Sequence, residues 1–184
     1  SQSSSADEED GGEGVAYKNT VDAKADYCID PEKSSTEGGY CTVHPVYAHH
    51  ARIKFVNNTP SDADNPDYGR IKLNKYQVDF SSDLANVPAL GTFEGATNIV
   101  VLAGGQDLGG AQFDALMVDF SLKAAFLDAV SDTSYTGPPP PLRYNAKYTF
   151  SGAGGLEVKG SVEFIIGDFN TCVSADKIMV SSCL

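Results

Sequence analysis

Residues 144–166, YNAKYTFSGAGGLEVKGSVEFII, hold two alternating runs on either side of a glycine-rich turn. From Tyr144 to Phe150, and again from Leu156 to Phe164, the apolar side chains fall on even positions, with polar residues between them, and Ile166 continues the even series. A period of two places one apolar face against a core and one polar face in water, as in half-buried antiparallel strands. The glycines of residues 151–155 accept the backbone angles of a tight reversal. The stretch therefore predicts a β-hairpin.

Shorter runs of the same kind recur earlier in the chain. Residues 70–80 (RIKLNKYQVDF) alternate with a change of phase at Asn74-Lys75, which predicts a β-bulge. Residues 116–122 (LMVDFSL) alternate again and are predicted to form a strand. Residues 123–130 (KAAFLDAV) fit either a short helix, with Phe126, Leu127 and Val130 on one face, or a continuing strand.

The spacing of these runs indicates the fold class. Seven or eight strands are joined by turns, without alternation of strands and helices and without a repeat of fixed period. This pattern predicts an all-β protein, an immunoglobulin-like antiparallel β-sandwich with an extended N-terminal arm. The chain has no Trp, so the Cys–Trp–Cys pattern of antibody domains is absent. We expect an acidic, Ser/Gly-rich arm at residues 1–25 and one sandwich domain at residues 26–184.

Composition excludes several classes of function. The net charge is −12 and no patch of Lys and Arg is visible, which argues against a nucleic-acid partner. No apolar run reaches the length of about 20 residues that a membrane-spanning helix needs. The sequence has no Gly-x-Ser-x-Gly, His-Glu-x-x-His or Ser-x-x-Lys motif, and its carboxylates fall mostly on outward strand positions or in loops. We therefore predict that the protein is not an enzyme.

Four cysteines, Cys28, Cys41, Cys172 and Cys183, lie towards the two ends of the chain. None forms a Cys-x-x-Cys pair, and four cysteines allow three disulfide connectivities. We favour the local pairs Cys28–Cys41 and Cys172–Cys183, each closing a short loop worth about 3 kcal/mol in the chain-entropy model. Disulfides imply an oxidising compartment, so we expect an exported protein, extracellular or on the cell surface, whose signal peptide has been removed. Four free thiols in a cytosolic protein are the alternative.

Two groups of residues are candidates for metal binding, although no cofactor is expected. His44, His49 and His50 supply imidazoles, which are common ligands of transition metals. Adjacent residues on a strand point to opposite faces, however, so His49 and His50 are not expected to bind one ion together. Asp62, Asp64 and Asp67 form an oxygen-rich loop of the kind that can bind calcium. We favour solvent-exposed histidines and a solvated acidic turn over either metal site.

One further motif concerns modification: residues 57–59 (NNT) match the N-glycosylation sequon, which matters only in a host that glycosylates.

The N-terminal arm begins with SQSSSADEEDGGEG, which carries five acidic residues and no base. Such a segment cannot bury enough apolar surface to offset the entropy of ordering it, so alone it should be a flexible tether. Residues that follow, among them Val15, Ala16, Tyr17 and Val21, can add as a strand to the sheet edge of a neighbouring chain. We expect the arm to gain order only against another molecule.

Three stretches carry a resemblance to a known group of proteins: RIKLNKYQVDF, MVDFSLK and PPPPLRYNAKYTFSGAGGLEVKGSVEFIIGDF. Their order resembles that of predicted secreted lipoproteins of metal-reducing bacteria, over about residues 53–169. The resemblance implies export, an immunoglobulin-like fold and anchoring through a lipidated cysteine that precedes a Ser-rich tether. Residue 1 of this sequence is Ser, and the resemblance implies no catalytic residues.

Two functions follow from these predictions. In the first, the protein is a structural subunit of an extracellular fibre or surface assembly, and its arm pairs with another copy of the chain or with a surface protein. In the second, it is a monomeric surface binding module whose end loops bind a metal, a carbohydrate or a partner such as a surface cytochrome. We favour the first, because no ligand site is evident in the sequence.

Overall fold

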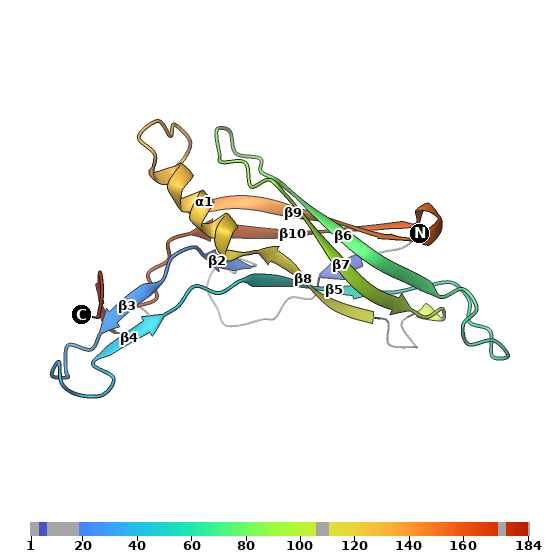
Figure 1. Cartoon of the computed structure of the whole chain (residues 1–184), viewed down its shortest axis with the longest axis horizontal. Coiled ribbons are helices and arrows are strands. Elements are labelled where there is room, and N and C mark those ends of the chain that lie inside the picture. Colours follow the sequence, from blue (N-terminus) through green and yellow to red (C-terminus); the bar gives the residue numbers. More distant parts are fainter. Residues whose placement is uncertain (1–3, 7–18, 106–110, 173–175, 184) are drawn as a thin grey trace.

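The structure, a computed structural model, describes residues 4–6, 19–105, 111–172 and 176–183, and it is elongated (Figure 1). The long strands are β5 (His49–Phe55), β6 (Ile71–Ser81), β7 (Thr92–Val101), β8 (Ala111–Val118), β9 (Leu142–Gly152) and β10 (Glu157–Gly167). The short strands are β1 (Ser4–Ala6), β2 (Thr20–Asp22), β3 (Asp26–Ile29), β4 (Cys41–His44) and β11 (Ile178–Val180). Helix α1 spans Phe120–Ser131, and the 3-10 turn η2 spans Ala153–Gly155.

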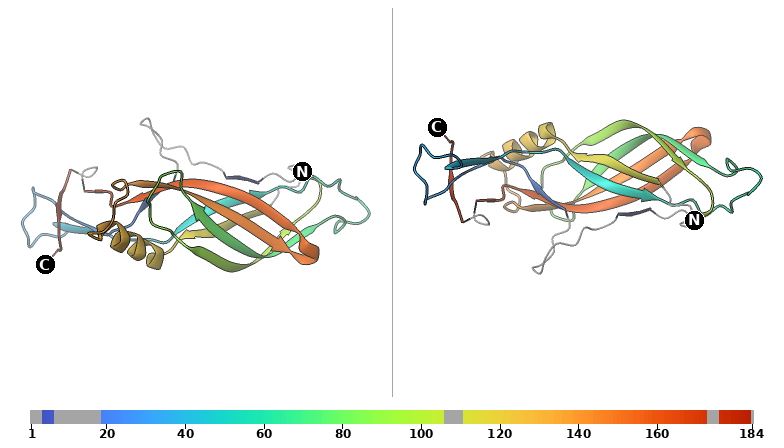
Figure 2. Two further views of the ribbon diagram at one scale, coloured as in Figure 1. Left: turned by 90° about the horizontal axis from the view of Figure 1, so that it is seen from above. Right: turned by 90° about the horizontal axis from the view of Figure 1, so that it is seen from below.

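The strands form three sheets. Five strands lie in the order β2-β10-β9-β6-β7, three in the order β1-β5-β8, and three in the order β11-β3-β4. All the pairings are antiparallel except that of β2 with β10, which is parallel. The first two sheets share one core, and the third lies at one end of the molecule (Figures 1 and 2). The described chain is thus mostly β, as expected. Its immunoglobulin-like arrangement stays a prediction, and its eleven strands exceed the expected seven or eight because the short ones show no alternation.

The hairpin predicted from residues 144–166 is confirmed. Strands β9 and β10 pair in one unbroken register, from Glu157 opposite Ser151 to Ile166 opposite Leu142. The even-numbered residues of β9 from Tyr144 to Phe150 are buried. In the turn, Gly154 and Gly155 have φ values of 72° and 75°, a left-handed conformation that favours glycine.

The predicted bulge in β6 is also confirmed. The register shifts between Leu73 and Lys75 against both neighbouring strands, β7 and β9. One extra residue reverses the phase of alternation, so Leu73 before the bulge and Tyr76 and Val78 after it all face the core. The apolar residues of β6 therefore stay on one side of the sheet despite their change from odd to even positions.

The strand predicted over residues 116–122 is wrong in its extent and its phase. Strand β8 ends at Val118, and its core-facing residues include Ala115 and Met117. Helix α1 begins at Phe120, whose side chain is 57% exposed. Asp119 starts the helix, because its Oδ1 accepts hydrogen bonds from the Leu122 amide at 2.8 Å and the Ser121 hydroxyl at 2.9 Å. The helical alternative for residues 123–130 is therefore the correct one.

Two buried tyrosines connect the two main sheets. The hydroxyl of Tyr76 on β6 accepts a hydrogen bond from the Leu116 amide, and the hydroxyl of Tyr148 on β9 donates one to the Leu116 carbonyl, both at 3.3 Å. Leu116 belongs to β8, the edge strand of the three-stranded sheet β1-β5-β8. Burial, with a smaller contribution from Tyr76, raises the pKa of Tyr148, which keeps this hydroxyl a neutral donor. The tyrosines thus satisfy polar groups that an open sheet edge would expose.

Asn57 of the sequon has a structural role. Its side chain is 1% exposed, its Nδ2 donates to the carbonyls of Gly69 at 2.7 Å and Val101 at 3.2 Å, and its Oδ1 accepts from the Thr59 amide. The amide nitrogen that glycosylation would modify is therefore inaccessible in the folded chain.

Candidate functional site

The four cysteines form two disulfides, but the predicted pairing is wrong. The bonds are Cys28–Cys172 and Cys41–Cys183. Cys28 on β3 lies opposite Thr42, and Cys41 on β4 lies opposite Ile29. Adjacent strand positions face opposite sides, so the two N-terminal cysteines project from different faces of their sheet and each meets a cysteine from the other end of the chain. The two bonds indicate an oxidising, extracellular or periplasmic environment.

The structure does not bring the candidate metal ligands together. His44 lies on β4 opposite Asp26, and its buried Nε2 has no hydrogen-bond partner. His49 and His50 begin β5, and the Nδ1 of His49 lies 3.2 Å from the Tyr47 carbonyl. Over the described ranges, no group of three or more His, Cys, Asp or Glu side chains is placed to hold a metal ion.

Two carboxylates of the acidic loop, those of Asp62 and Asp67, form contacts within the loop itself. Asp62 accepts a hydrogen bond from the Asp64 amide at 2.9 Å, and Asp67 forms an ion pair with Arg70 at 3.0 Å. These contacts stabilise the loop conformation, as Asp side chains commonly do in turns.

A buried lysine, which sequence reasoning missed, joins helix α1 to the end of β2 and to the segment before β5. Lys123 on α1 is 1% exposed, and its Nζ donates to the carbonyls of Asp22 and Tyr47, each at 2.6 Å. Lys123 precedes Phe126, Leu127 and Val130 by three, four and seven positions, so it shares their helix face. The position of a lysine on the apolar face of the predicted helix is the sequence signal that could have identified this buried ammonium group.

Burial shifts the pKa values of Lys123 and of two groups near it. It lowers the pKa of Lys123 itself, an effect that the charge of Asp22 partly opposes. It raises the pKa of Asp22, and it lowers that of His49, where the nearby Lys123 charge adds to the effect. Because its ammonium group donates to two backbone carbonyls from separate segments, we assign Lys123 a structural role.

The arm divides into a fixed part and a terminal strand. Val21 in β2 is fully buried, and β2 pairs with β10 of the same chain. Asn19 is held there too, because its carbonyl accepts from the Ile165 amide and its Nδ2 donates to the Glu163 carbonyl. Residues 19–25 therefore belong to the body of the protein. The other predicted arm residues, Val15, Ala16 and Tyr17, lie outside the described residues.

The terminal strand β1 pairs with an edge of the main body. Ser4, Ser5 and Ala6 lie antiparallel to Phe55, Lys54 and Ile53 of β5. Among the described strands, β1 is the one that occupies this edge, and without it the sheet would keep only β5 and β8. A third strand satisfies backbone groups that the edge of β5 would otherwise expose. The N-terminal strand thus pairs with its own chain, so the expectation that the arm gains order only against another molecule is wrong for residues 4–6.

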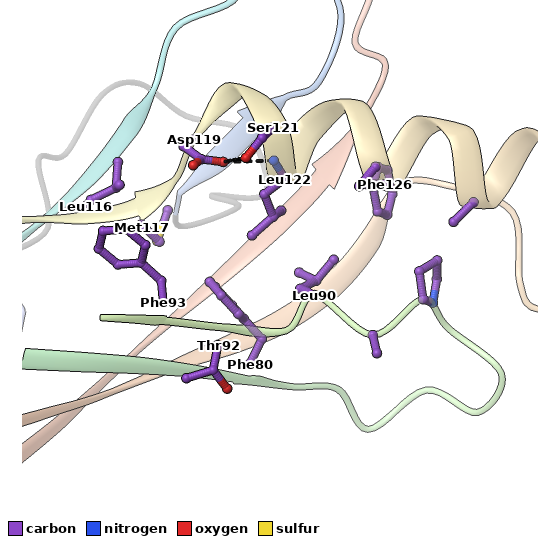
Figure 3. Close-up of a pocket in the computed structure, with 14 residues that line it drawn as sticks. Phe80, Leu90, Thr92, Phe93, Leu116, Met117, Asp119, Ser121, Leu122 and Phe126 are labelled. Carbon is purple, nitrogen blue, oxygen red and sulfur yellow. Dashed lines mark hydrogen bonds between the residues drawn. The ribbon is translucent and has the colours of Figure 1, made fainter. Parts of the chain in front are cut away.

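A cavity of about 450 Å³ lies where α1 leaves β8 (Figure 3). Its walls come from the end of β6, the start of β7, the segment before β7, the end of β8 and one face of α1. Most of the lining is apolar: Phe80, Pro88, Ala89, Leu90, Phe93, Leu116, Met117, Leu122, Ala125, Phe126 and Ala129. Tyr144 fixes one wall, because its hydroxyl donates to the Pro88 carbonyl at 2.8 Å. The mostly apolar lining suits an apolar ligand.

Comparisons of the chain with family models, with curated proteins and with solved structures found no match. Over the described residues, no helix is long and apolar enough to cross a membrane.

Proposed function

We propose that this protein is a non-enzymatic, exported structural subunit that assembles into an extracellular fibre or coat by exchanging N-terminal strands between copies. The observation that carries the proposal is the pairing of Ser4, Ser5 and Ala6 with the edge of β5. A neighbouring chain can supply the same three residues in the same register, and the backbone hydrogen bonds gained would be identical.

The length of chain between β1 and the body of the protein supports exchange of the strand between copies. The body holds the chain from Asn19 onward, and residues 7–18 separate that point from β1. Those residues read DEEDGGEGVAYK, and fully extended they span roughly 40 Å. A donor strand on such a connection can reach a second molecule. Because donor and acceptor are different surfaces, donation of the strand in one direction is head-to-tail, and when the contacts do not close into a ring they propagate into an open filament.

The proposal includes the location and the fold type. Two disulfides support a place outside the cytoplasm, and we infer the cell surface or the extracellular space, as in the secreted lipoproteins that the sequence resembles. Two sheets packed on one core, with long antiparallel hairpins, support an immunoglobulin-like sandwich.

Removal of residues 1–18 tests the proposal. The shortened chain keeps Asn19, β2 and both disulfides, so it should fold, which circular dichroism and the mass of the non-reduced protein will verify. Electron microscopy and light scattering should then show filaments for the full chain and single particles for the shortened one. A synthetic peptide of residues 1–18 should bind the shortened body, whereas a peptide with residues 4–6 replaced by glycine should not. Filaments from the shortened chain would refute the proposal.

A surface binding module is the second candidate, and the apolar cavity beside α1 is the observation that favours it. This function does not need the arm, so removal of residues 1–18 should leave ligand binding unchanged. Binding that disappears with the arm would count against it.

A further inference from the structure

Next to the cavity beside α1 lies a second, more open groove of about 630 Å³. The two share Pro88 and Ala129, and the groove runs between the segment that holds Pro88 and the C-terminal half of α1. Asp128 and Asp132 line this groove. A largely apolar cavity thus lies beside an open groove whose charged lining residues are acidic.

The charged residues that line the cavity and the neighbouring groove have one sign. Among the described residues that line the cavity or the groove, Asp119, Asp128 and Asp132 are acidic, and none is Lys, Arg or His. Hydrogen bonds from the Ser134 hydroxyl and amide lower the pKa of Asp132 and keep it ionised. The chain as a whole carries a net charge of −12. A ligand with a positive group at one end is therefore favoured, and an anionic ligand is repelled.

The polar groups of the cavity wall already form hydrogen bonds with other groups of the protein. The Pro88 carbonyl accepts from Tyr144, the Thr92 hydroxyl donates to Asp79 at 3.0 Å, and Asp119 caps α1. A peptide backbone placed in the cavity would find few partners for its N–H and C=O groups, at a cost for each one left unpaired. An alkyl or aryl chain has no such groups to satisfy.

We propose that this site binds a cationic amphiphile, a small molecule with an apolar alkyl or aryl tail and an ammonium group. The tail lies in the cavity against Phe80, Leu90, Phe93 and Phe126 (Figure 3). The ammonium group lies in the groove, near Asp128 and Asp132. This inference gives the binding-module candidate a ligand class and is independent of strand exchange.

Three probes of equal chain length test the ligand class: decylammonium and decanoate, each kept below its micelle concentration, and decanol, kept below its solubility limit. Isothermal titration of the full chain should show one decylammonium bound per molecule, at least tenfold tighter than decanoate. Decanoate binding as tightly as decylammonium, or no decylammonium binding, would overturn the proposal. Because the arm plays no part, a chain without residues 1–18 should give the same titration, so the outcome does not depend on assembly.

Two substitutions locate the tail and the ammonium group. Ala129 lines both the cavity and the groove, so Ala129→Leu should fill part of each and weaken decylammonium binding at least tenfold, whereas Ala124→Leu, on the exposed side of the same helix, should not. Asp128→Asn should reduce the preference for decylammonium over decanol severalfold and leave decanol binding unchanged. Unfolding midpoints will show that each variant is folded. Unchanged binding by Ala129→Leu would place the ligand elsewhere and contradict the assignment.

Discussion

Gly95 on β7 lies directly opposite Tyr76 on β6, and the tyrosine ring fills the space where a side chain at residue 95 would be. A Cβ atom on residue 95 would lie 2.6 Å from Cε1 of the ring and 2.9 Å from its hydroxyl oxygen. The ring stacks on Phe150, and its hydroxyl accepts from the Leu116 amide, so both sides constrain it.

Gly95→Ala should therefore lower the free energy of unfolding by about 1–3 kcal/mol, the usual cost of overpacking a core. The gain from restricting the unfolded chain, about 0.4–1 kcal/mol, is smaller than this cost. Chemical denaturation measures the difference, with Ala96→Ser on the exposed side of β7 as the control. A Gly95→Ala variant as stable as the parent would show that the ring can move aside.

The buried ammonium of Lys123 should stabilise the end of the molecule where α1, β2 and the segment before β5 meet. Lys123→Met keeps much of the side-chain volume but leaves the carbonyls of Asp22 and Tyr47 without their donor. We expect the free energy of unfolding to fall by about 2 kcal/mol, the scale of buried acceptors left unpaired. Lys147→Met, on the exposed face of β9, should change it by less than about 0.5 kcal/mol.

An increase in stability on Lys123→Met would contradict this account. It would mean that desolvation of the ammonium group costs more than its two hydrogen bonds contribute.

His49 should make stability depend on pH in the mildly acidic range. Burial, together with the Lys123 charge, lowers the pKa of His49 below its ordinary value of 6.5. The unfolded chain then takes up this proton at a higher pH than the folded chain, so stability falls as the pH drops below about 6.5. His49→Gln should remove part of that fall, and His50→Gln, at the exposed neighbouring position, should not. Equal pH profiles for the two variants, from about pH 5 to pH 8, would refute the assignment.

The two disulfides should differ in their ease of reduction. Cys28 and Cys172 are fully buried, whereas Cys183 is exposed. A mild reductant should therefore open Cys41–Cys183 first, which alkylation and mass spectrometry will detect. Both bonds close loops of similar length, with separations of 144 and 142 residues, and either one alone is worth about 5 kcal/mol in the chain-entropy model. Opening of Cys28–Cys172 first would contradict the burial that the structure gives these residues.

The parts of the fold that sequence could predict are those governed by local alternation. The β9–β10 hairpin and the bulge at Asn74-Lys75 follow from the positions of apolar residues within one or two strands. The end of β8 did not follow, because residues 116–122 continue the alternation through Asp119. The helix there depends on the hydrogen bond that the Asp119 side chain makes with the Leu122 amide.

The disulfide pairing and the candidate sites depend on contacts between distant segments. Cys28 meets Cys172 because β3 presents it on the face covered by the chain's other end, and no local pattern encodes that choice. The place of β1 beside β5 and the cavity beside α1 likewise arise from segments far apart in sequence. Only Lys123, on the apolar face of a predicted helix, carried a signal that sequence reasoning could have used.

Cross-linking between two differently tagged chains tests strand exchange most directly. Ser5 and Lys54 are cross-strand partners in the β1–β5 register. One chain carries Ser5→Cys and the other Lys54→Cys, and the two are mixed, assembled and oxidised. Strand exchange predicts a disulfide between the two tags, and no such bond when Arg52→Cys, beyond the end of β1, replaces Lys54→Cys. The account is contradicted if the mixture yields no bond between tags while one chain carrying both Ser5→Cys and Lys54→Cys closes entirely on itself.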